Sequence, residues 1–130
     1  MLQDRRILNP RLLAMLAGAG HTDTIVIADS GLPIAPGVEV LDLSLTPGVP
    51  SFLQTFDVVR ETLAVERMIL AKETEGQPLY RQLEPRLGTV RVEVVSHEEF
   101  KRLAARAKGV IRTGECTPYA NIALVAGVTF

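Results

Sequence analysis

The sequence has one cysteine, two histidines and no tryptophan, and these shortages exclude several kinds of chemistry. The single Cys116 cannot form a disulfide within the chain. His21 and His97 lie far apart and offer no metal-ligand spacing with that cysteine, so we expect no metal and no cofactor. The remaining options are proton transfer by acid–base side chains, or binding alone.

Long apolar runs and an excess of basic residues are also missing. No apolar stretch approaches the ~18 residues of a membrane-spanning helix, and the N-terminus does not resemble a secretory signal peptide. Fourteen basic residues against fifteen acidic ones, without a basic stripe, argue against a nucleic-acid partner. We therefore expect a soluble, cytoplasmic protein with no membrane and no nucleic-acid partner.

Apolar residues, in contrast, are abundant. Hydrophobic residues make up 47% of the 130 residues, and the mean hydropathy is +0.21. Residues 1–130 have the length of one domain, but so short a chain has a limited interior for these side chains. The closing run IALVAGVTF stays apolar up to Phe130. We expect a homo-oligomer larger than a dimer, in which the C-terminal segment contributes to an interface near loop 119–121.

Helix-like and strand-like patterns alternate along the chain. Asn9 before Pro10 is typical of a helix start, Ser51 can cap a second helix, and the tetrapeptide SHEE that begins at Ser96 matches a capping box. The predicted helices cover residues 10–18 (ending at Gly18 or Gly20), 51–62, 77–87 and 96–107. The predicted strands cover residues 24–28, 40–45, 65–71, 89–95, 109–112 and 121–126. For residues 65–71, a continuation of the preceding helix is the alternative.

This alternation indicates an α/β fold, a single layered domain with a mainly parallel or mixed sheet flanked by helices. In open α/β sheets, ligands bind beyond the carboxyl ends of the strands. Asp29 follows the first predicted strand and His97 follows the fourth. A third polar loop, TGECTPYAN, carries Glu115, Tyr119 and Asn121. We expect these loops to converge at one rim of the sheet.

Each candidate residue also has a structural interpretation. His21 could interact with the negative end of the first helix, and Asp29 could be a turn residue before Ser-Gly. His97 could be a solvated residue in the first turn of a helix. Tyr119 or Asn121 could simply shape their loop.

Two further features are not interpreted as functional. Cys116 has no histidine near it in sequence, so we interpret it as a small apolar filler and not as a nucleophile. The GAG at residues 18–20 precedes a strand and does not join a strand to a helix, so it is not a dinucleotide-binding fingerprint.

Four segments together resemble the D-ribose pyranase family, whose relatives are the L-fucose mutarotases. They are GHTDTIVIADSGLPIAPGV, LTPGVPSF, HEEFK and RTGECTPYANIALVAGVTF, and they lie in order along almost the whole chain. Only residues 72–88 lack a signature. The combination is highly specific, and the ending YANIALVAGVTF is similar to the ribose-type pattern. The only departure near the motif residues is Ser30, where alanine is frequent.

The resemblance implies an activity and a set of site residues. The family interconverts the pyranose and furanose forms of a free sugar and supplies the furanose to a kinase, without a cofactor. His21 falls on the proton-donor histidine of GHTD. The implied sugar-binding residues are Asp29, His97, Lys101, Tyr119, Ala120 and Asn121. Family members resemble cytoplasmic ring oligomers, often decamers, with sites near subunit contacts.

This activity agrees with the chemistry that the residues permit. Ring opening needs one proton placed on the ring oxygen and one removed from the anomeric hydroxyl, and a histidine with an ordinary pKa of ~6.5 serves both directions. The substrate is then free D-ribose. Two alternatives stay open: a sugar-binding accessory protein without catalytic activity, and a mutarotase that acts mainly on fucose-like sugars.

Overall fold

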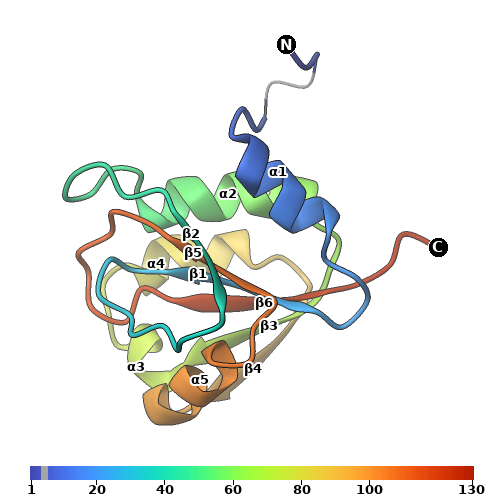
Figure 1. Cartoon of the computed structure of the whole chain (residues 1–130). Helices are drawn as coiled ribbons and strands as arrows, with labels where there is room; N and C mark the ends of the chain where they lie inside the picture. Colours follow the sequence, from blue (N-terminus) through green and yellow to red (C-terminus); the bar gives the residue numbers. More distant parts are fainter. Residues whose placement is uncertain (4–5) are drawn as a thin grey trace.

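The computed structural model, which describes residues 1–3 and 6–130, is built around a six-stranded sheet with helices on both faces (Figure 1). The strands follow the order β2-β5-β1-β6-β3-β4. Their bounds are β1 Thr24–Ala28, β2 Glu39–Asp42, β3 Val65–Ala71, β4 Arg91–Val95, β5 Gly109–Arg112 and β6 Ile122–Ala126. β6 runs antiparallel to both of its neighbours, β1 and β3, whereas the other pairs are parallel. The predicted α/β class is confirmed, with the sheet in its mixed form.

The helices divide between the two faces of the sheet. α1 Pro10–Ala17 and α2 Phe52–Thr62 cover the upper face in Figure 1, and α5 His97–Ala104 covers the lower one. Three shorter elements, α3 Lys72–Glu75, α4 Tyr80–Leu83 and the 3-10 helix η1 Glu84–Arg86, fill the connection between β3 and β4. None of the helices in the described ranges is long and apolar enough to cross a membrane.

Side-chain caps start the three main helices where the sequence predicts them. Asn9 accepts hydrogen bonds from the amides of Arg11 and Leu12 at 2.9 and 3.0 Å, which satisfies donors that have no partner inside a helix. Ser51 and Gln54 form a reciprocal capping box. Ser96 accepts from the amide of Glu99 at 3.1 Å, which fixes the start of α5, but only this half of the capping box predicted at SHEE is found among the described residues.

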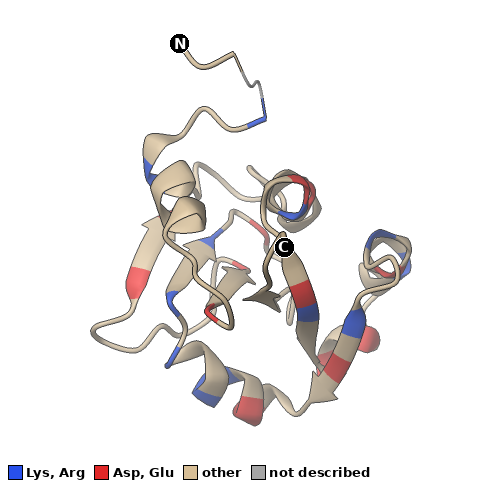
Figure 2. Ribbon diagram, turned by 90° about the vertical axis from the view of Figure 1, so that its right-hand side faces the viewer, with Lys and Arg blue, Asp and Glu red and all other residues tan. Residues whose placement is uncertain are grey.

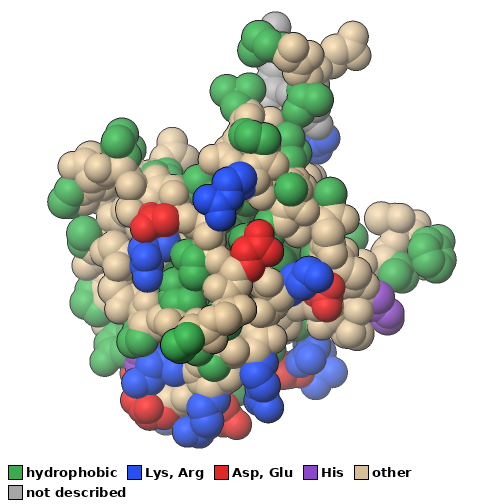
Figure 3. Space-filling model, viewed as in Figure 1, with side chains coloured by type: hydrophobic (Ala, Val, Ile, Leu, Met, Phe, Trp, Pro, Cys, Tyr) green, Lys and Arg blue, Asp and Glu red, His purple; other side chains and the backbone are tan. Residues whose placement is uncertain are grey.

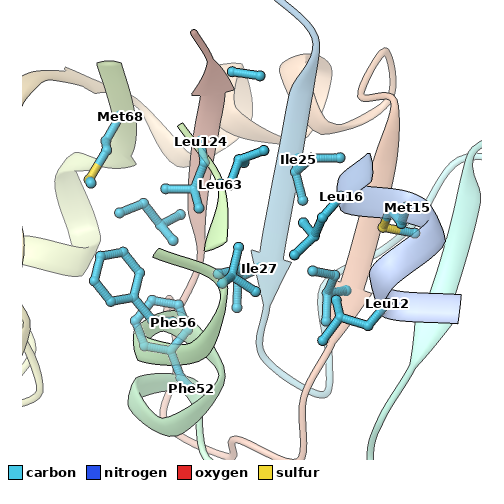
Figure 4. Packing of buried hydrophobic residues seen from close by; sticks show 14 of the residues in the cluster. Leu12, Met15, Leu16, Ile25, Ile27, Phe52, Phe56, Leu63, Met68 and Leu124 are labelled. Atoms are coloured by element: carbon cyan, nitrogen blue, oxygen red, sulfur yellow. The ribbon is translucent and has the colours of Figure 1, made fainter. Parts of the chain in front are cut away.

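The core has one layer on each face of the sheet, because successive side chains of a strand point to opposite faces. On the upper face, Ile25 and Ile27 of β1 contact a cluster that includes Phe52 and Phe56 of α2 (Figure 4). On the lower face, Val26 of the same strand belongs to the cluster around Phe100 and Ala104 of α5. β1 is therefore buried on both sides, as its continuous apolar run predicts.

Several predicted boundaries are wrong for local reasons. The strand predicted at 40–45 ends at Asp42, whose carboxylate accepts hydrogen bonds from the amide and hydroxyl of Ser44 and closes a turn. The helix predicted at 77–87 is broken into α4 and η1, because Pro85 lacks an amide hydrogen and clashes with the preceding turn. α3 was not predicted, the strand predicted from residue 89 begins at Arg91, and α5 ends at Ala104 instead of residue 107.

Charged side chains are mixed over the body, whereas both chain ends carry exposed apolar side chains. Figure 2 shows basic and acidic positions interspersed along strands and helices. Figure 3 shows apolar side chains on the N-terminal segment, at the top, and on the C-terminal tail, at the right, both outside the body. Leu8 and Phe130 belong to these segments and are 73% and 103% exposed.

Candidate functional site

One end of each of the six strands lies at the same edge of the sheet. For the five parallel strands it is the C-terminal end, and for the antiparallel strand it is the N-terminal end. Ala28 of β1 pairs with Arg112 of β5, and Ala71 of β3 pairs with Val95 of β4. Because β6 runs the other way, its first residue, Ile122, lies at this edge. We call it the carboxyl edge. The carboxyl edge adjoins Asp29, residues 72–75, His97, the loop 113–120 and Asn121.

Asp29 and Asn121 form the most constrained pair at the carboxyl edge. Asn121 is fully buried, and its side-chain oxygen accepts from the amide of Asp29 at 2.9 Å, while its amide group donates to the Asp29 carboxylate at 3.3 Å. The amide of Gly31 donates to the other carboxylate oxygen at 3.0 Å. These bonds fix the orientation of the carboxylate and leave it lone pairs for further donors, such as hydroxyl groups.

His97 and Tyr119 lie against each other, as the predicted convergence of their loops requires. Their ring centroids are 4.9 Å apart at an interplanar angle of 83°, an edge-to-face contact. Nδ1 of His97 is buried and has no hydrogen-bond partner within the described part of the chain. A buried polar atom without a partner costs about 1–3 kcal/mol, so this nitrogen is suited to a hydrogen bond from a ligand.

Tyr119 is held in a strained backbone conformation. Its φ angle of 61° lies in the left-handed region, which is unfavourable for a residue with a side chain. Its carbonyl accepts from the hydroxyl of Thr74 at 2.6 Å and from the amide of Asn121 at 2.9 Å. Thr74, on α3, is 1% exposed. No sequence motif points to Thr74, because it lies in the segment 72–88 that carries no motif.

The rest of this loop is tied to neighbouring elements. The Glu115 carboxylate accepts from the amide of Phe52, at the start of α2, at 3.0 Å and from the hydroxyl of Thr117 at 2.9 Å. The Glu115 carbonyl accepts from the amide of Ser30 at 2.8 Å. Ala120 is 1% exposed and packs in the core, so it offers a ligand only its backbone. The loop is therefore a rigid connection between β5 and β6.

Cys116 does not have the position predicted for it. Its side chain is exposed and donates to the carbonyl of Gly114 at 3.5 Å. It lines two adjoining hollows of about 200 and 230 Å³, which also share Ser30, and Asp29 lines the smaller one. The interpretation of Cys116 as a buried filler is wrong. Neither hollow includes His97 or Tyr119, and both are smaller than the 300–1,000 Å³ usual for ligand sites.

Lys101 lies one helical turn after His97 on α5. Its ammonium group contacts the carboxylate of Glu98 at 2.8 Å, and this hydrogen bond holds the pKa of the Glu98 carboxyl below its usual value. Among the described residues, the ammonium group of Lys101 is therefore paired with Glu98 and not with Asp29 or Tyr119.

His21 lies at the opposite edge of the sheet, in the turn that precedes β1. The turn is fixed by a bond from the amide of Gly20 to the Asp23 carboxylate and by one from the amide of Thr22 to the carbonyl of Ala126, each 2.9 Å long. Nε2 of His21 lies 2.9 Å from a carboxylate oxygen of Glu66. His21 thus has a partner on β3 and does not cap the first helix.

His21 and Asp29 cannot act on one sugar within one chain. The five residues of β1 separate them, and at ~3.3 Å per residue this strand alone spans roughly 13 Å. If His21 and Asp29 serve the same sugar, they must therefore come from two copies of the chain.

In residues 1–3 and 6–130, no group of three or more His, Cys, Asp or Glu side chains is arranged to hold a metal ion.

Comparison with known proteins places this arrangement in a family. The model of the RbsD / FucU transport protein family matches residues 2–129. The chain belongs to the RbsD/FucU family. The D-ribose pyranase of Bacillus cytotoxicus is 51% identical over 126 residues, which cover 95% of this chain and 96% of that protein. The D-ribose pyranase of Geobacillus kaustophilus is 52% identical, with coverages of 95% and 93%.

Solved structures of RbsD/FucU proteins show the same fold. The structure of Bacillus subtilis RbsD complexed with D-ribose matches with a TM-score of 0.93 at 50% identity, over 99% of this chain and 100% of that one. The fucose mutarotase of Streptococcus pneumoniae in complex with L-fucose matches with a TM-score of 0.79 at 25% identity, over 99% and 100% of the two chains. This chain is thus more similar to the ribose-binding relative than to the fucose-binding one.

Proposed function

We propose that this protein interconverts the pyranose and furanose forms of free D-ribose and so supplies the furanose for phosphorylation in the cytoplasm. Relatives of about 50% identity over nearly the whole chain carry the name D-ribose pyranase. The observation that carries the proposal is the fixed Asp29 carboxylate on the same edge as the unpartnered Nδ1 of His97. Together they offer a hydroxyl-rich ligand both a fixed acceptor and a ring nitrogen.

The reaction needs only proton transfers. A proton is placed on the ring oxygen as its bond to the anomeric carbon breaks, and the anomeric hydroxyl gives up a proton as the aldehyde forms. Closure on a different hydroxyl reverses both transfers. His21 is the group that gives the proton and recovers it, because an imidazole exchanges protons readily near neutral pH. No metal or cofactor takes part in this scheme.

The sugar is bound by the residues at the carboxyl edge. The Asp29 carboxylate accepts hydrogen bonds from its hydroxyl groups, His97 accepts or donates them, and the Tyr119 ring covers one side. Ala120 contributes its backbone. Asn121 acts through Asp29, because both of its side-chain polar groups already contact that residue. Lys101 lies one turn from His97 and contacts the sugar after leaving Glu98.

A second copy of the chain completes the site. His21 lies a full strand length from Asp29, and the hollow beside Asp29 is lined by neither His97 nor Tyr119. A head-to-tail contact between copies would place the His21 edge of one chain over the carboxyl edge of the next, and a closed ring is the usual result of such contacts. We propose a ring-based homo-oligomer, a decamer. The exposed apolar chain ends are suited to contacts between its subunits.

Magnetization-transfer NMR on D-ribose tests the activity directly. The protein should accelerate exchange between the pyranose and furanose signals of D-ribose in the absence of metal and cofactor. L-fucose serves as the comparison sugar, and we expect weaker acceleration, in line with the lower identity to the fucose mutarotase. Binding of ribose without any change in exchange rate would show an accessory sugar-binding protein instead.

A further inference from the structure

We propose that Glu66 is a positioning residue that acts through His21. The inference rests on the proposed function and concerns how the acid–base group is held. A carboxylate is only an acceptor, so the 2.9 Å contact from Nε2 of His21 to the Glu66 oxygen requires the hydrogen to be on Nε2. Glu66 thereby holds the hydrogen on Nε2, so that Nδ1 is the nitrogen that gives its proton to the sugar from the imidazolium form and takes a proton back in the neutral form.

The backbone of β3 is irregular at this residue. Val65 pairs with Ala126 and Arg67 pairs with Val125, so Glu66 is the extra residue of a bulge. Bulges redirect a side chain out of the alternating pattern of a strand and are over-represented next to active sites. In a regular strand, Glu66 would face the side of the sheet opposite to both neighbours, whereas the bulge leaves it free to turn to the strand end, where His21 lies.

The C-terminal end of β6 contacts both the turn that carries His21 and the segment that precedes Glu66. The amide of Thr22 donates to the carbonyl of Ala126, and the amide of Gly127 donates to the carbonyl of Ala64 at 2.8 Å. A Cβ atom on Gly127 would lie 3.2 Å from the Cβ of Glu66, so a glycine allows this close approach. One short backbone segment therefore sets the distance between the imidazole and the carboxylate.

Strain next to His21 is consistent with a functional constraint. Thr22 has a φ angle of 71°, which is unfavourable for a β-branched residue. The pair that this turn supports is exposed, with 54% of the His21 side chain and 40% of the Glu66 side chain accessible. Exposed ion pairs contribute little to stability. Stability therefore does not explain why the chain keeps a strained turn here. The orientation that the turn gives to His21 is the better explanation.

Glu93 provides a matched control. It accepts from Arg67, the residue next to Glu66, at the same distance of 2.9 Å, and its side chain is 31% exposed. Glu93 also contacts Arg91 at 3.2 Å, so Glu93→Ala removes at least as many surface ion pairs from this region as Glu66→Ala does, without touching His21. A loss of activity through general loosening of β3 would affect both variants equally.

The test compares Glu66→Ala, Glu66→Gln and Glu93→Ala in the assembled protein by NMR exchange of D-ribose. Glu66→Ala should lower kcat about tenfold or more, a part of the total contribution of a general acid–base group, with KM changed less than about twofold. Glu66→Gln should recover most of the rate, because its amide oxygen accepts from the same N–H. Glu93→Ala should retain the wild-type rate.

A wild-type kcat in Glu66→Ala, an equal loss in Glu93→Ala, or a Glu66→Gln variant no faster than Glu66→Ala would each overturn the inference. His21→Ala measured in the same series separates the two proposals, because an inactive His21→Ala beside a fully active Glu66→Ala refutes the role of Glu66 alone. Nitrogen NMR of labelled His21 gives a readout independent of turnover. The Nε2–H form should dominate in the wild type, and Glu66→Ala should show a larger Nδ1–H fraction; identical spectra would contradict the proposal.

Discussion

The two edges of the sheet are built in different ways. At the carboxyl edge, the candidate binding groups are held by buried partners: Asn121 is fully buried under Asp29, and Thr74 is 1% exposed under Tyr119. At the opposite edge, His21 and Glu66 are about half exposed. A group that binds a sugar must be preorganised before the ligand arrives. In the proposed assembly, by contrast, the proton-transfer group is completed when another copy of the chain covers it.

The largest effect is expected from His21→Ala. If this edge supplies the acid–base group, pyranose–furanose exchange should fall by roughly 10²- to 10⁴-fold. The melting temperature should stay near that of the wild type, because the exposed pair with Glu66 is worth about 0–1 kcal/mol. NMR exchange and thermal unfolding measure the two quantities. A nearly normal exchange rate would shift the acid–base role to His97.

Complementation between copies tests whether the two edges meet. His21→Ala and Asp29→Asn each remove one half of the proposed site, so each variant alone should be nearly inactive. After co-assembly in equal amounts, roughly a quarter of the contacts should unite two intact halves in a closed ring that mixes at random. The mixture should recover a corresponding part of the wild-type exchange rate. Activity no higher than the sum of the separate variants would mean that each site lies within a single chain.

The C-terminal tail gives the next effect. The predicted place of this tail, near loop 119–121, does not hold within one chain, because β6 ends at the His21 edge, where Gly127 contacts Glu66. The tail still carries an exposed Phe130. Deletion of residues 127–130 should weaken assembly and lower activity several-fold, since ~25 cal/mol is lost for each Å² of apolar contact. Sedimentation and NMR exchange measure both. Unchanged assembly and full activity would exclude the tail from the interface.

Thr74→Val tests whether Thr74 supports the binding residues at the carboxyl edge. It removes the hydroxyl that supports the strained Tyr119 carbonyl, with little change in volume, and should lower the free energy of unfolding by about 1–2 kcal/mol. KM for ribose should rise more than kcat falls, because Thr74 acts on binding geometry. Thr62→Val is the control, since Thr62 donates to a carbonyl within α2, away from this edge. Equal effects of both substitutions on KM would remove Thr74 from the site.

Features that depend on residues close together in the sequence could be predicted, whereas features that depend on distant residues could not. Caps at Asn9, Ser51 and Ser96 and the two-sided strand 24–28 follow from local rules and were predicted. The resemblance to the family also named residues that the fold brings to the carboxyl edge, such as Asp29 and His97. Their roles in binding and catalysis are still predictions.

Contacts set by topology could not be predicted in the same way. The antiparallel insertion of β6 between β1 and β3 places Asn121 under Asp29 and Ala126 beside His21, and no local pattern specifies that order. The role of Thr74 depends on a short helix in the segment without a motif. The position of Glu66 depends on a bulge. Both are long-range features that a single sequence does not reveal.

The smallest effect is expected at Asp42, on the outer end of the carboxyl edge. Hydrogen bonds from the Ser44 hydroxyl and amide, with a smaller contribution from Arg112, hold the pKa of this carboxyl below its usual value of 3.8. Since the folded-state pKa is the lower one, the ionised group stabilises the fold above pH ~4, and this stabilisation is lost as the pH falls through the folded-state pKa. The carboxylate is 46% exposed, so the contribution is at most about 1 kcal/mol.

Asp42→Asn should therefore lower the melting temperature by about 2–4 °C at pH 7, and the difference from the wild type should shrink only below pH ~4. Thermal unfolding of both proteins between pH 7 and pH 3 measures this trend. Glu39→Gln, at the exposed start of the same strand, is the control for loss of a surface carboxylate. Because the contacts of Asp42, with Ser44 and Arg112, do not include the binding residues, ribose exchange should stay at the wild-type rate. A gap that does not shrink at all as the pH falls would show that the carboxylate charge is not its cause. An exchange rate that falls with stability would show that this outer turn is coupled to the binding residues and that the rigid part of the carboxyl edge extends to β2.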